Sequence, residues 1–175
     1  CVGAGMPGSH VDRTVGIVKA YSTCVGEGPF TAEWFGEKAE NLREKGGEYG
    51  ASTGRPRRVG PIDLVATRYG CRIQGATEVA LTKLDVLSYM KEIPVCTQYE
   101  VNGEKTDDFP FTAVIDEAKP VLTTVPGWGC DISGVRKYED LPQAARDYVE
   151  YVEQAIGVHI SYVSVGAGRD EIIYR

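Results

Sequence analysis

The chain has 175 residues, of which 42% are hydrophobic and 25% are charged, a composition typical of a soluble globular domain that buries a substantial core. Its formal net charge of −6 at pH 7 argues against nucleic-acid binding and gives no reason to expect attachment to an anionic membrane surface. No apolar run approaches the roughly 18 residues that a membrane-spanning helix needs. Any anion-binding site must therefore be local.

The five cysteines are far apart and form no C-x-x-C pair, which argues against a disulfide scaffold and against a cysteine-based zinc site. This usage fits a reducing compartment, so we expect a cytoplasmic protein. Neither His10 nor His159 has a pattern of cysteines or carboxylates around it that specifies a metal. The opening CVGAGMPG lacks the features of a signal peptide, and we expect that the chain was cut inside a Gly-rich loop.

Hydrophobic periodicity predicts strands that alternate with helices. Residues 15–25 (VGIVKAYSTCV) are rich in β-branched and aromatic side chains, which favours a strand. Residues 31–45 (TAEWFGEKAENLREK) show the spacing of an amphipathic helix, with Thr31 as its expected N-cap. A second helix is expected over 61–74, because Pro61 is favoured near the first position of a helix.

The rest of the chain continues this alternation. We expect strands over 78–82, 93–101, 111–125 and 158–165, an acidic turn over 102–108, and a helix over 141–156. Such an order indicates an α/β architecture with a mostly parallel sheet and flanking helices. Residues 1–175 show no internal repeat, and we expect a single domain.

A loop at 47–58 (GEYGASTGRPRR) carries three arginines in an acidic chain. Its small residues leave backbone N–H groups accessible, and the helix expected from Pro61 would bring its positive end close by. Guanidinium groups present a planar, bidentate fork to anions, so Arg55, Arg57 and Arg58 are expected to hold phosphate or carboxylate. The alternative is a solvated basic turn that pairs with the acidic surface.

The sequence Thr82-Lys83-Leu84-Asp85 follows an expected strand and resembles the Asn/Thr-Lys-x-Asp element of guanine-nucleotide-binding proteins. There the aspartate accepts from two adjacent N–H donors of guanine, and the lysine stem lies along the base. A carboxylate that meets two donors on one purine is left unpaired by the other, so discrimination is large. The alternative is an ordinary exposed strand end.

The small-residue turn 164–168 (SVGAG) directly follows the last expected strand. Ligands of α/β sheets gather at the carboxyl ends of strands, so this turn is a candidate second wall for a purine base beside Lys83 and Asp85. Taken alone, such a sequence more often forms only a tight turn.

Several motifs, in this order, are similar to those of the adenylosuccinate synthetase family. They are 19–23 (KAYST), 25–30 (VGEGPF), 50–58 (GASTGRPRR), 80–87 (ALTKLDVL), 126–128 (PGW) and 131–135 (DISGV). The resemblance covers nearly the whole chain and corresponds to the C-terminal portion of the family's proteins. It implies an α/β fold related to P-loop NTPases.

The resemblance implies a GTP-dependent carbon–nitrogen ligase of purine biosynthesis. GTP phosphorylates the 6-oxygen of IMP, and the amino group of L-aspartate then displaces that phosphate to give adenylosuccinate, GDP and phosphate. By resemblance, aspartate and IMP contact Val25, Ala51, Ser52, Thr53, Gly54, Arg55, Pro56 and Arg57. GTP contacts Arg57, Lys83, Leu84, Asp85, Ser164, Val165 and Gly166.

The family's Gly-rich phosphate loop, its catalytic Asp and His and its Mg²⁺ ligands belong to an N-terminal portion that this chain does not contain. We therefore expect no catalytic residue and no metal ligand here, and no turnover by this chain alone. The resemblance also implies a homodimer. Cys24 and Pro61-Ile62 depart from the usual family pattern. The alternative functions are an inactive guanine-nucleotide-binding module and a scaffold.

Overall fold

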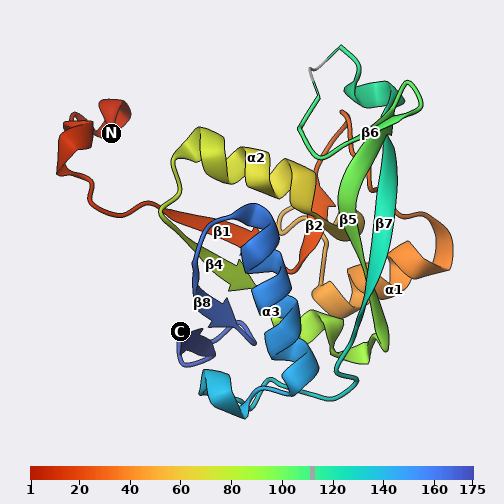
Figure 1. Ribbon diagram of the computed structural model, residues 1–175. Coiled ribbons are helices and arrows are strands. Elements are labelled where there is room, and N and C mark those ends of the chain that lie inside the picture. Colours follow the sequence, from red (N-terminus) through yellow and green to blue (C-terminus); the bar gives the residue numbers. More distant parts are fainter. Residues whose placement is uncertain (111–112) are drawn as a thin grey trace.

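A computed structural model describes residues 1–110 and 113–175, and Figure 1 shows its mixture of helices and strands. The α-helices are α1 (Gly36–Gly46), α2 (Leu64–Gln74) and α3 (Gln143–Ile156). The strands are β1 (Val15–Lys19), β2 (Tyr21–Cys24), β3 (Arg58–Asp63), β4 (Glu78–Thr82), β5 (Glu92–Val101), β6 (Glu104–Thr106), β7 (Lys119–Pro126), β8 (Ile160–Ser164) and β9 (Ile172–Tyr174). In the described part of the chain, no helix is both long enough and apolar enough to cross a membrane.

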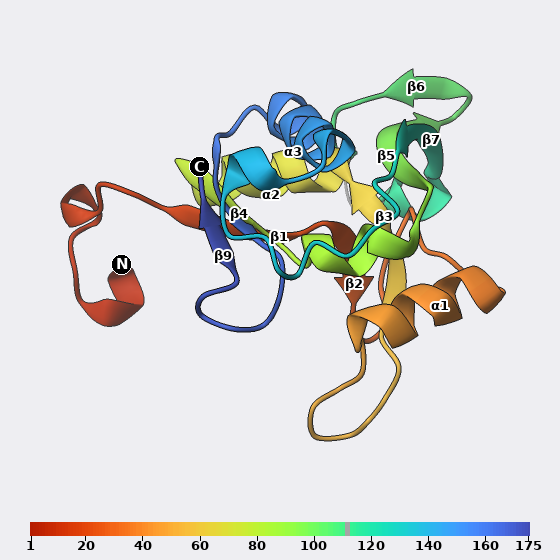
Figure 2. The same cartoon turned by 90° about the horizontal axis from the view of Figure 1, so that it is seen from below.

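The first sheet has the strand order β1-β4-β8-β9. Strands β1, β4 and β8 are parallel to one another, and β9 is antiparallel to β8. Lys19 pairs with Thr82, and Leu81 pairs with Val163, so the carboxyl ends of three parallel strands meet at one end of this sheet. Helices α2 and α3 lie side by side on one face of it (Figures 1 and 2).

The second sheet is mixed. Its order is β2-β3-β5-β6, with β7 also paired to β5. Only the β3–β5 pair is parallel among its described pairs, because β2, β6 and β7 each run antiparallel to their neighbours. The expectation of a mostly parallel sheet is therefore right for the first sheet and wrong for the second.

The expected strand 15–25 is two strands in different sheets. The chain leaves the first sheet at Ala20, whose N–H donates to the carbonyl of Thr82 at 2.8 Å and whose carbonyl accepts from the Tyr148 hydroxyl at 2.7 Å. Ala20 is buried, and its small side chain suits this crowded crossing. Strand β2 then begins at Tyr21 and pairs with β3.

The first two of the three expected helices start later than predicted. Helix α1 begins at Gly36 and not near Thr31, because the backbone N–H of Trp34 bonds to the carbonyl of Val59 at 2.8 Å and holds the preceding segment against β3. The segment from 58 to 63 is strand β3, so Pro61 lies in a strand. Asp63 is the N-cap of α2, accepting from the N–H of Ala66 at 3.0 Å.

The remaining predictions agree in part with the structure. Strand 78–82 and helix 141–156 are confirmed to within two residues. The expected strand 111–125 begins only at Lys119, its residues 111–112 lie outside the described residues, and 115–117 form a 3₁₀ turn. The acidic turn contains the short strand β6, and β9 was not predicted.

Candidate functional site

The arginine loop, residues 47–57, is a closed loop between α1 and β3 that projects from the body of the protein (Figure 2). The N–H of Gly50 donates to the carbonyl of Arg55 at 2.9 Å, and the N–H of Gly54 donates to the carbonyl of Gly50 at 2.8 Å. Gly54 has a φ of 65°, which glycine adopts without strain. The six residues 51–56 are exposed, as a ligand-binding loop requires.

The three arginines do not act as one group. Arg55 is exposed on the loop, and its N–H donates to the Thr53 hydroxyl at 3.3 Å. Arg57 points to a buried carboxylate described below. Arg58 is the first residue of β3, and its guanidinium bonds to Glu33 at 2.6 Å and to the carbonyl of Gly28 at 2.8 Å. Arg58 therefore fixes the segment before α1, and the structure does not bring the three guanidinium groups together at one point; anion binding by Arg58 stays a prediction.

No helix begins beside this loop, since α2 starts at Leu64 after the whole of β3. The expected contribution of a helix dipole from Pro61 is therefore wrong. Val25 lies just after β2 and has 77% of its surface exposed, so it is free to contact a ligand. The Arg58 guanidinium also bonds to the carbonyl of Gly26, which holds the backbone next to Val25.

The guanine loop, Lys83–Asp85, leaves the carboxyl end of β4. Lys83 has a φ of 61°, and it caps a 3₁₀ helix that spans Leu84–Tyr89. Leu84 is fully buried, which anchors the loop. Burial raises the pKa of the Asp85 carboxyl, as do the charges of Glu171 and Asp131, whereas its own backbone N–H and Lys83 act in the opposite direction. A carboxylate in that situation gains strongly from two N–H donors on a ligand.

The turn after β8 lies beside this loop because β4 and β8 are neighbouring parallel strands. The Ser164 hydroxyl donates to the carbonyl of Gly166 at 2.8 Å, and the N–H of Val165 donates to the carbonyl of Glu171 at 2.9 Å. A Cβ on Gly166 would lie 2.4 Å from the carboxyl carbon of Glu171, so the Glu171 side chain packs directly against the backbone of this turn. The structure thus brings together the two segments that the sequence suggested as walls of one site.

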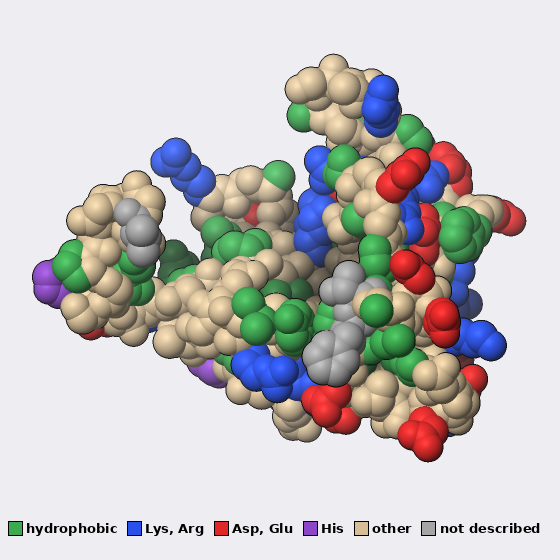
Figure 3. Space-filling model, turned by 90° about the horizontal axis from the view of Figure 1, so that it is seen from above, with side chains coloured by type: hydrophobic (Ala, Val, Ile, Leu, Met, Phe, Trp, Pro, Cys, Tyr) green, Lys and Arg blue, Asp and Glu red, His purple; other side chains and the backbone are tan. Residues whose placement is uncertain are grey.

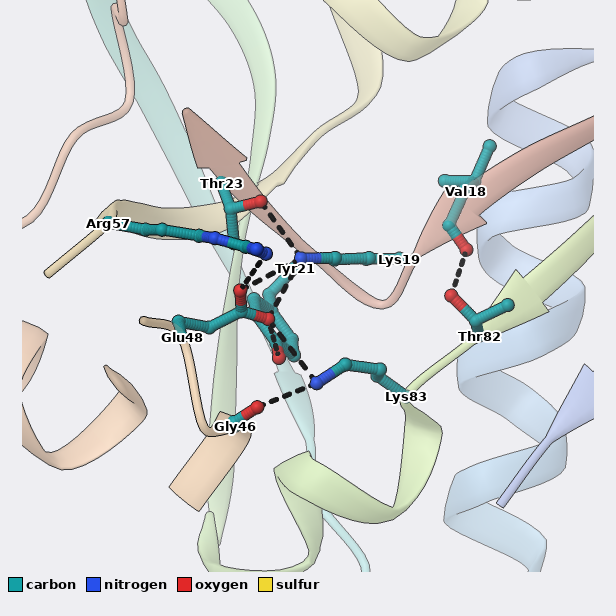
Figure 4. Close-up of polar contacts among 9 residues, drawn as sticks. All are labelled: Val18, Lys19, Tyr21, Thr23, Gly46, Glu48, Arg57, Thr82 and Lys83. Carbon is teal, nitrogen blue, oxygen red and sulfur yellow. Dashed lines mark hydrogen bonds and ion pairs between the residues drawn. The ribbon is translucent and has the colours of Figure 1, made fainter. Parts of the chain in front are cut away.

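A buried carboxylate that the sequence analysis did not single out connects these loops. Glu48 is fully buried, and in Figure 4 the side chains of Lys19, Tyr21, Arg57 and Lys83 point toward its carboxylate. We call this group the Glu48 cluster: Lys19, Tyr21, Glu48, Arg57 and Lys83. Its carboxylate accepts from Lys19 Nζ at 2.8 and 3.0 Å, from the Tyr21 hydroxyl at 2.6 Å and from Arg57 Nη1 at 2.9 Å. Lys83 Nζ lies 3.5 Å from Glu48 Oε1.

The electrostatics of the cluster favour an ionised Glu48. Burial by itself raises the pKa of this carboxyl, but hydrogen bonds from Lys19 and Tyr21 and the charges of Lys19 and Lys83 outweigh it, so the pKa lies below its ordinary value. Burial raises the pKa of Tyr21, and the bond to Glu48 adds to the rise, so its hydroxyl stays protonated as a donor. Three cations around one carboxylate leave a net positive charge at the base of the arginine loop.

Acidic and basic side chains are interspersed on the face shown in Figure 3.

Among residues 1–110 and 113–175, no group of three or more His, Cys, Asp or Glu side chains is arranged to hold a metal ion. All five cysteines are free thiols.

An α/β fold with candidate loops at strand ends places the chain in the class of α/β proteins that bind ligands at the edge of a parallel sheet. The sequence model of the adenylosuccinate synthetase family matches residues 1–173, and the chain belongs to this family. It is 49% identical to the adenylosuccinate synthetase of Bifidobacterium adolescentis over 99% of its own length and 41% of that protein. It is 50% identical to the enzyme of Salinibacter ruber over 99% of its own length and 40% of that protein.

The fold is also that of a solved structure in the family. The chain superimposes on the fully ligated adenylosuccinate synthetase from Plasmodium falciparum with a TM-score of 0.94 and 35% identity, covering 99% of this chain and 42% of that one. The α/β fold expectation is confirmed by this match. The chain spans about two fifths of the length of these relatives.

Proposed function

We propose that this chain supplies the aspartate-binding and guanine-binding part of an adenylosuccinate synthetase, which joins IMP and L-aspartate at the expense of GTP. One observation carries the proposal: the Glu48 cluster connects the arginine loop to the guanine loop at the carboxyl ends of parallel strands. That is where an α/β sheet binds its ligands.

The same arrangement suggests a role for each loop. Asp85 accepts from the two N–H donors of guanine, Lys83 lies along the base, and the turn at Ser164, Val165 and Gly166 forms the opposite wall. Adenine lacks this donor pair and leaves the carboxylate unpaired, which explains a preference for GTP.

The arginine loop suits a dicarboxylate and a phosphate. Ala51, Ser52, Thr53, Gly54 and Pro56 form the exposed loop, Arg55 reaches toward aspartate and IMP, and Arg57 reaches toward GTP. Val25 offers an apolar contact to IMP. Preorganised positive charge stabilises both a bound carboxylate and the negative charge of a phosphoryl group during its transfer.

The open edge of the first sheet supports the proposal that a longer protein completes this fold. Among the described residues, β1 pairs only with β4, and Ile17 on β1 has 71% of its surface exposed. A groove of about 370 Å³ runs along this edge between β1 and α2. Parallel strands are normally covered, so the rest of the polypeptide is proposed to pack here.

We further propose, from the motifs that the chain shares with the family, that it forms the C-terminal portion and that the phosphate loop and catalytic groups belong to the rest of the protein. Among the described residues no group of three or more His, Cys, Asp or Glu side chains is arranged for Mg²⁺. We propose, from the family resemblance alone, that its ligands lie outside this chain. A cytoplasmic location, a homodimer and a relation to P-loop NTPases belong to the same proposal. The complete gene tests the placement: a coding segment for these residues at its 5′ end would contradict it.

A second candidate is a guanine-nucleotide-binding module without catalysis. This function is favoured because the guanine loop and the Ser164 turn lie side by side and both belong to residues 1–175, so they need no other part of a longer protein to meet. Product analysis separates the two functions. The full-length protein is expected to form adenylosuccinate from GTP, IMP and aspartate with Mg²⁺, and residues 1–175 alone are expected to form none. A full-length protein that binds GDP but forms no adenylosuccinate would support the module instead.

A further inference from the structure

We propose that Glu48 is a positioning residue that holds Arg57 and Lys83 in place, and thereby couples binding at the arginine loop to binding at the guanine loop. This inference rests on the proposed function of the two loops. Glu48 itself is buried beneath them and is given no contact with a substrate.

The geometry shows that both carboxylate oxygens are used. Oε1 accepts from Tyr21 and Lys19 and lies near Lys83, while Oε2 accepts from Arg57 and Lys19. These partners come from separate parts of the chain, namely the end of β1, the start of β2, the arginine loop and the guanine loop (Figure 4). One buried group therefore fixes two loops that have no other common carboxylate partner among the described ion pairs.

At Arg57, the contacts that hold the backbone of the loop are distinct from the contact that orients the side chain. The backbone at Arg57 is already held, because its N–H donates to the carbonyl of Glu48 at 2.9 Å and its carbonyl accepts from Arg43 Nε at 3.0 Å. The hydrogen bond to the Glu48 carboxylate additionally fixes the orientation of the Arg57 guanidinium group. A guanidinium already fixed in place loses less conformational entropy when an anion binds.

Lys83 is held in the same way. Its Nζ donates to the carbonyl of Gly46 at 2.6 Å and lies 3.5 Å from Glu48, so the side chain extends from the end of β4 to the end of α1 and the base of the arginine loop (Figure 4). Loss of the carboxylate would leave Lys19, Arg57 and Lys83 close together without a counter-ion. Their mutual repulsion favours movement of Arg57 and Lys83 toward solvent, away from the ligand positions.

The test uses the full-length protein and the nearly isosteric substitution Glu48→Gln. We expect the Kd for GDP and the KM for aspartate each to rise by about tenfold, the size typical of coupling within one ion-pair network. Glu48→Asp keeps the charge but shortens the reach, so it is expected to give smaller rises in both constants. It also serves as the test if the glutamine variant does not fold.

Glu153→Gln is the matched control. Glu153 is also partly buried, bonds to Arg175 and His159, and accepts from the N–H of Ile160 at the amino end of β8, opposite the site. This variant is expected to lose thermal stability without a change in either constant.

Two results would overturn the inference. Unchanged Kd and KM in folded Glu48→Gln or Glu48→Asp would show a merely structural role. A lower Kd for GDP or a lower KM for aspartate in these variants would show that Glu48 holds Arg57 and Lys83 away from the ligands and does not orient them for binding. Failure of the unsubstituted protein to form adenylosuccinate would instead contradict the proposed function, because GDP affinity is measured independently of turnover.

Discussion

Lys83 Nζ lies 3.5 Å from Glu48 Oε1, and the carbonyl of Glu48 accepts from the N–H of Arg57 at the other end of the arginine loop. The contact between Lys83 and Glu48 therefore joins the loop after β4 to the base of the arginine loop. All five residues of the Glu48 cluster lie at strand ends or loop bases, whereas Arg55 is exposed on the arginine loop and Asp85 is partly buried on the guanine loop. The candidate site thus has a buried charged base beneath two loops. Substitutions in the two loops and substitutions in the buried base are therefore expected to have different effects on binding and stability.

Asp85→Asn tests the guanine assignment. We expect kcat/KM for GTP to fall by at least about 100-fold, because the amide no longer presents two acceptor positions to the N–H donors of guanine. Xanthosine triphosphate carries a carbonyl in place of the 2-amino group, so the asparagine amide can donate to it, and activity should return with that nucleotide. Steady-state kinetics with both nucleotides measure this, and equal losses with both would count against the assignment.

Arg55→Ala tests the arginine loop separately from the guanine loop. We expect the KM for aspartate to rise about 10- to 100-fold, the value of a charge-assisted hydrogen bond, because Arg55 is exposed and is not part of the Glu48 cluster. The Kd for GDP should stay unchanged, since no contact of Arg55 reaches the guanine loop in the described structure. A parallel rise in the Kd for GDP would contradict the separation of the two loops.

Gly46→Ala is expected to destabilise the protein. A Cβ at Gly46 would lie 2.4 Å from the Tyr21 hydroxyl, which donates to Glu48, so the cluster must shift at a cost of about 1 to 3 kcal/mol. Gly70→Ala is the matched control within a helix, because no atom lies within 4 Å of its added Cβ. Helix propensity makes that control neutral or stabilising by up to about 1 kcal/mol. Thermal unfolding of both variants measures the difference, and equal effects would contradict the packing argument.

The contribution of Glu48 to stability should depend on pH. Its folded-state pKa is lower than its ordinary value of 4.5, so the native state releases this proton more readily than the unfolded state. The stabilisation is therefore complete above the ordinary pKa and is lost as the pH falls through the folded value. The difference in unfolding midpoint between the unsubstituted protein and Glu48→Gln should be largest near neutral pH and should shrink below about pH 4. A difference that does not change with pH would show that folding does not shift the pKa of Glu48, and a difference that grows as the pH falls would show a raised pKa; either result would contradict the ion-pair account.

Local signals were enough for the parts of the fold that have clear ends. Strand 78–82 is apolar and is followed by polar residues, and α3 has a strongly amphipathic pattern, so both were predicted closely. Strand β3 was missed because Pro61 favours a helix start, whereas burial of Val59, Gly60 and Ile62 between β2 and β5 decides for a strand. Tertiary packing overrides the local preference there.

The candidate site was predicted at its loops but not at its base. The order of strands places Lys83 and Ser164 together, and small residues mark both turns. Glu48 has no local signal, because its partners Lys19, Tyr21 and Lys83 come from distant segments that only the folded chain brings together. Lys19 lay in the middle of the strand predicted over 15–25, and only the structure shows that β1 ends at this residue.

The central claim is that the loops at 47–57 and 83–85 form a site for aspartate and a guanine nucleotide. Calorimetric titration of the full-length protein with GDP, ADP and inosine diphosphate tests it most directly. We predict that GDP binds at least about 100-fold more tightly than ADP, and that inosine diphosphate, which keeps one of the two N–H donors, lies between them. Equal affinity for GDP and ADP would contradict the account.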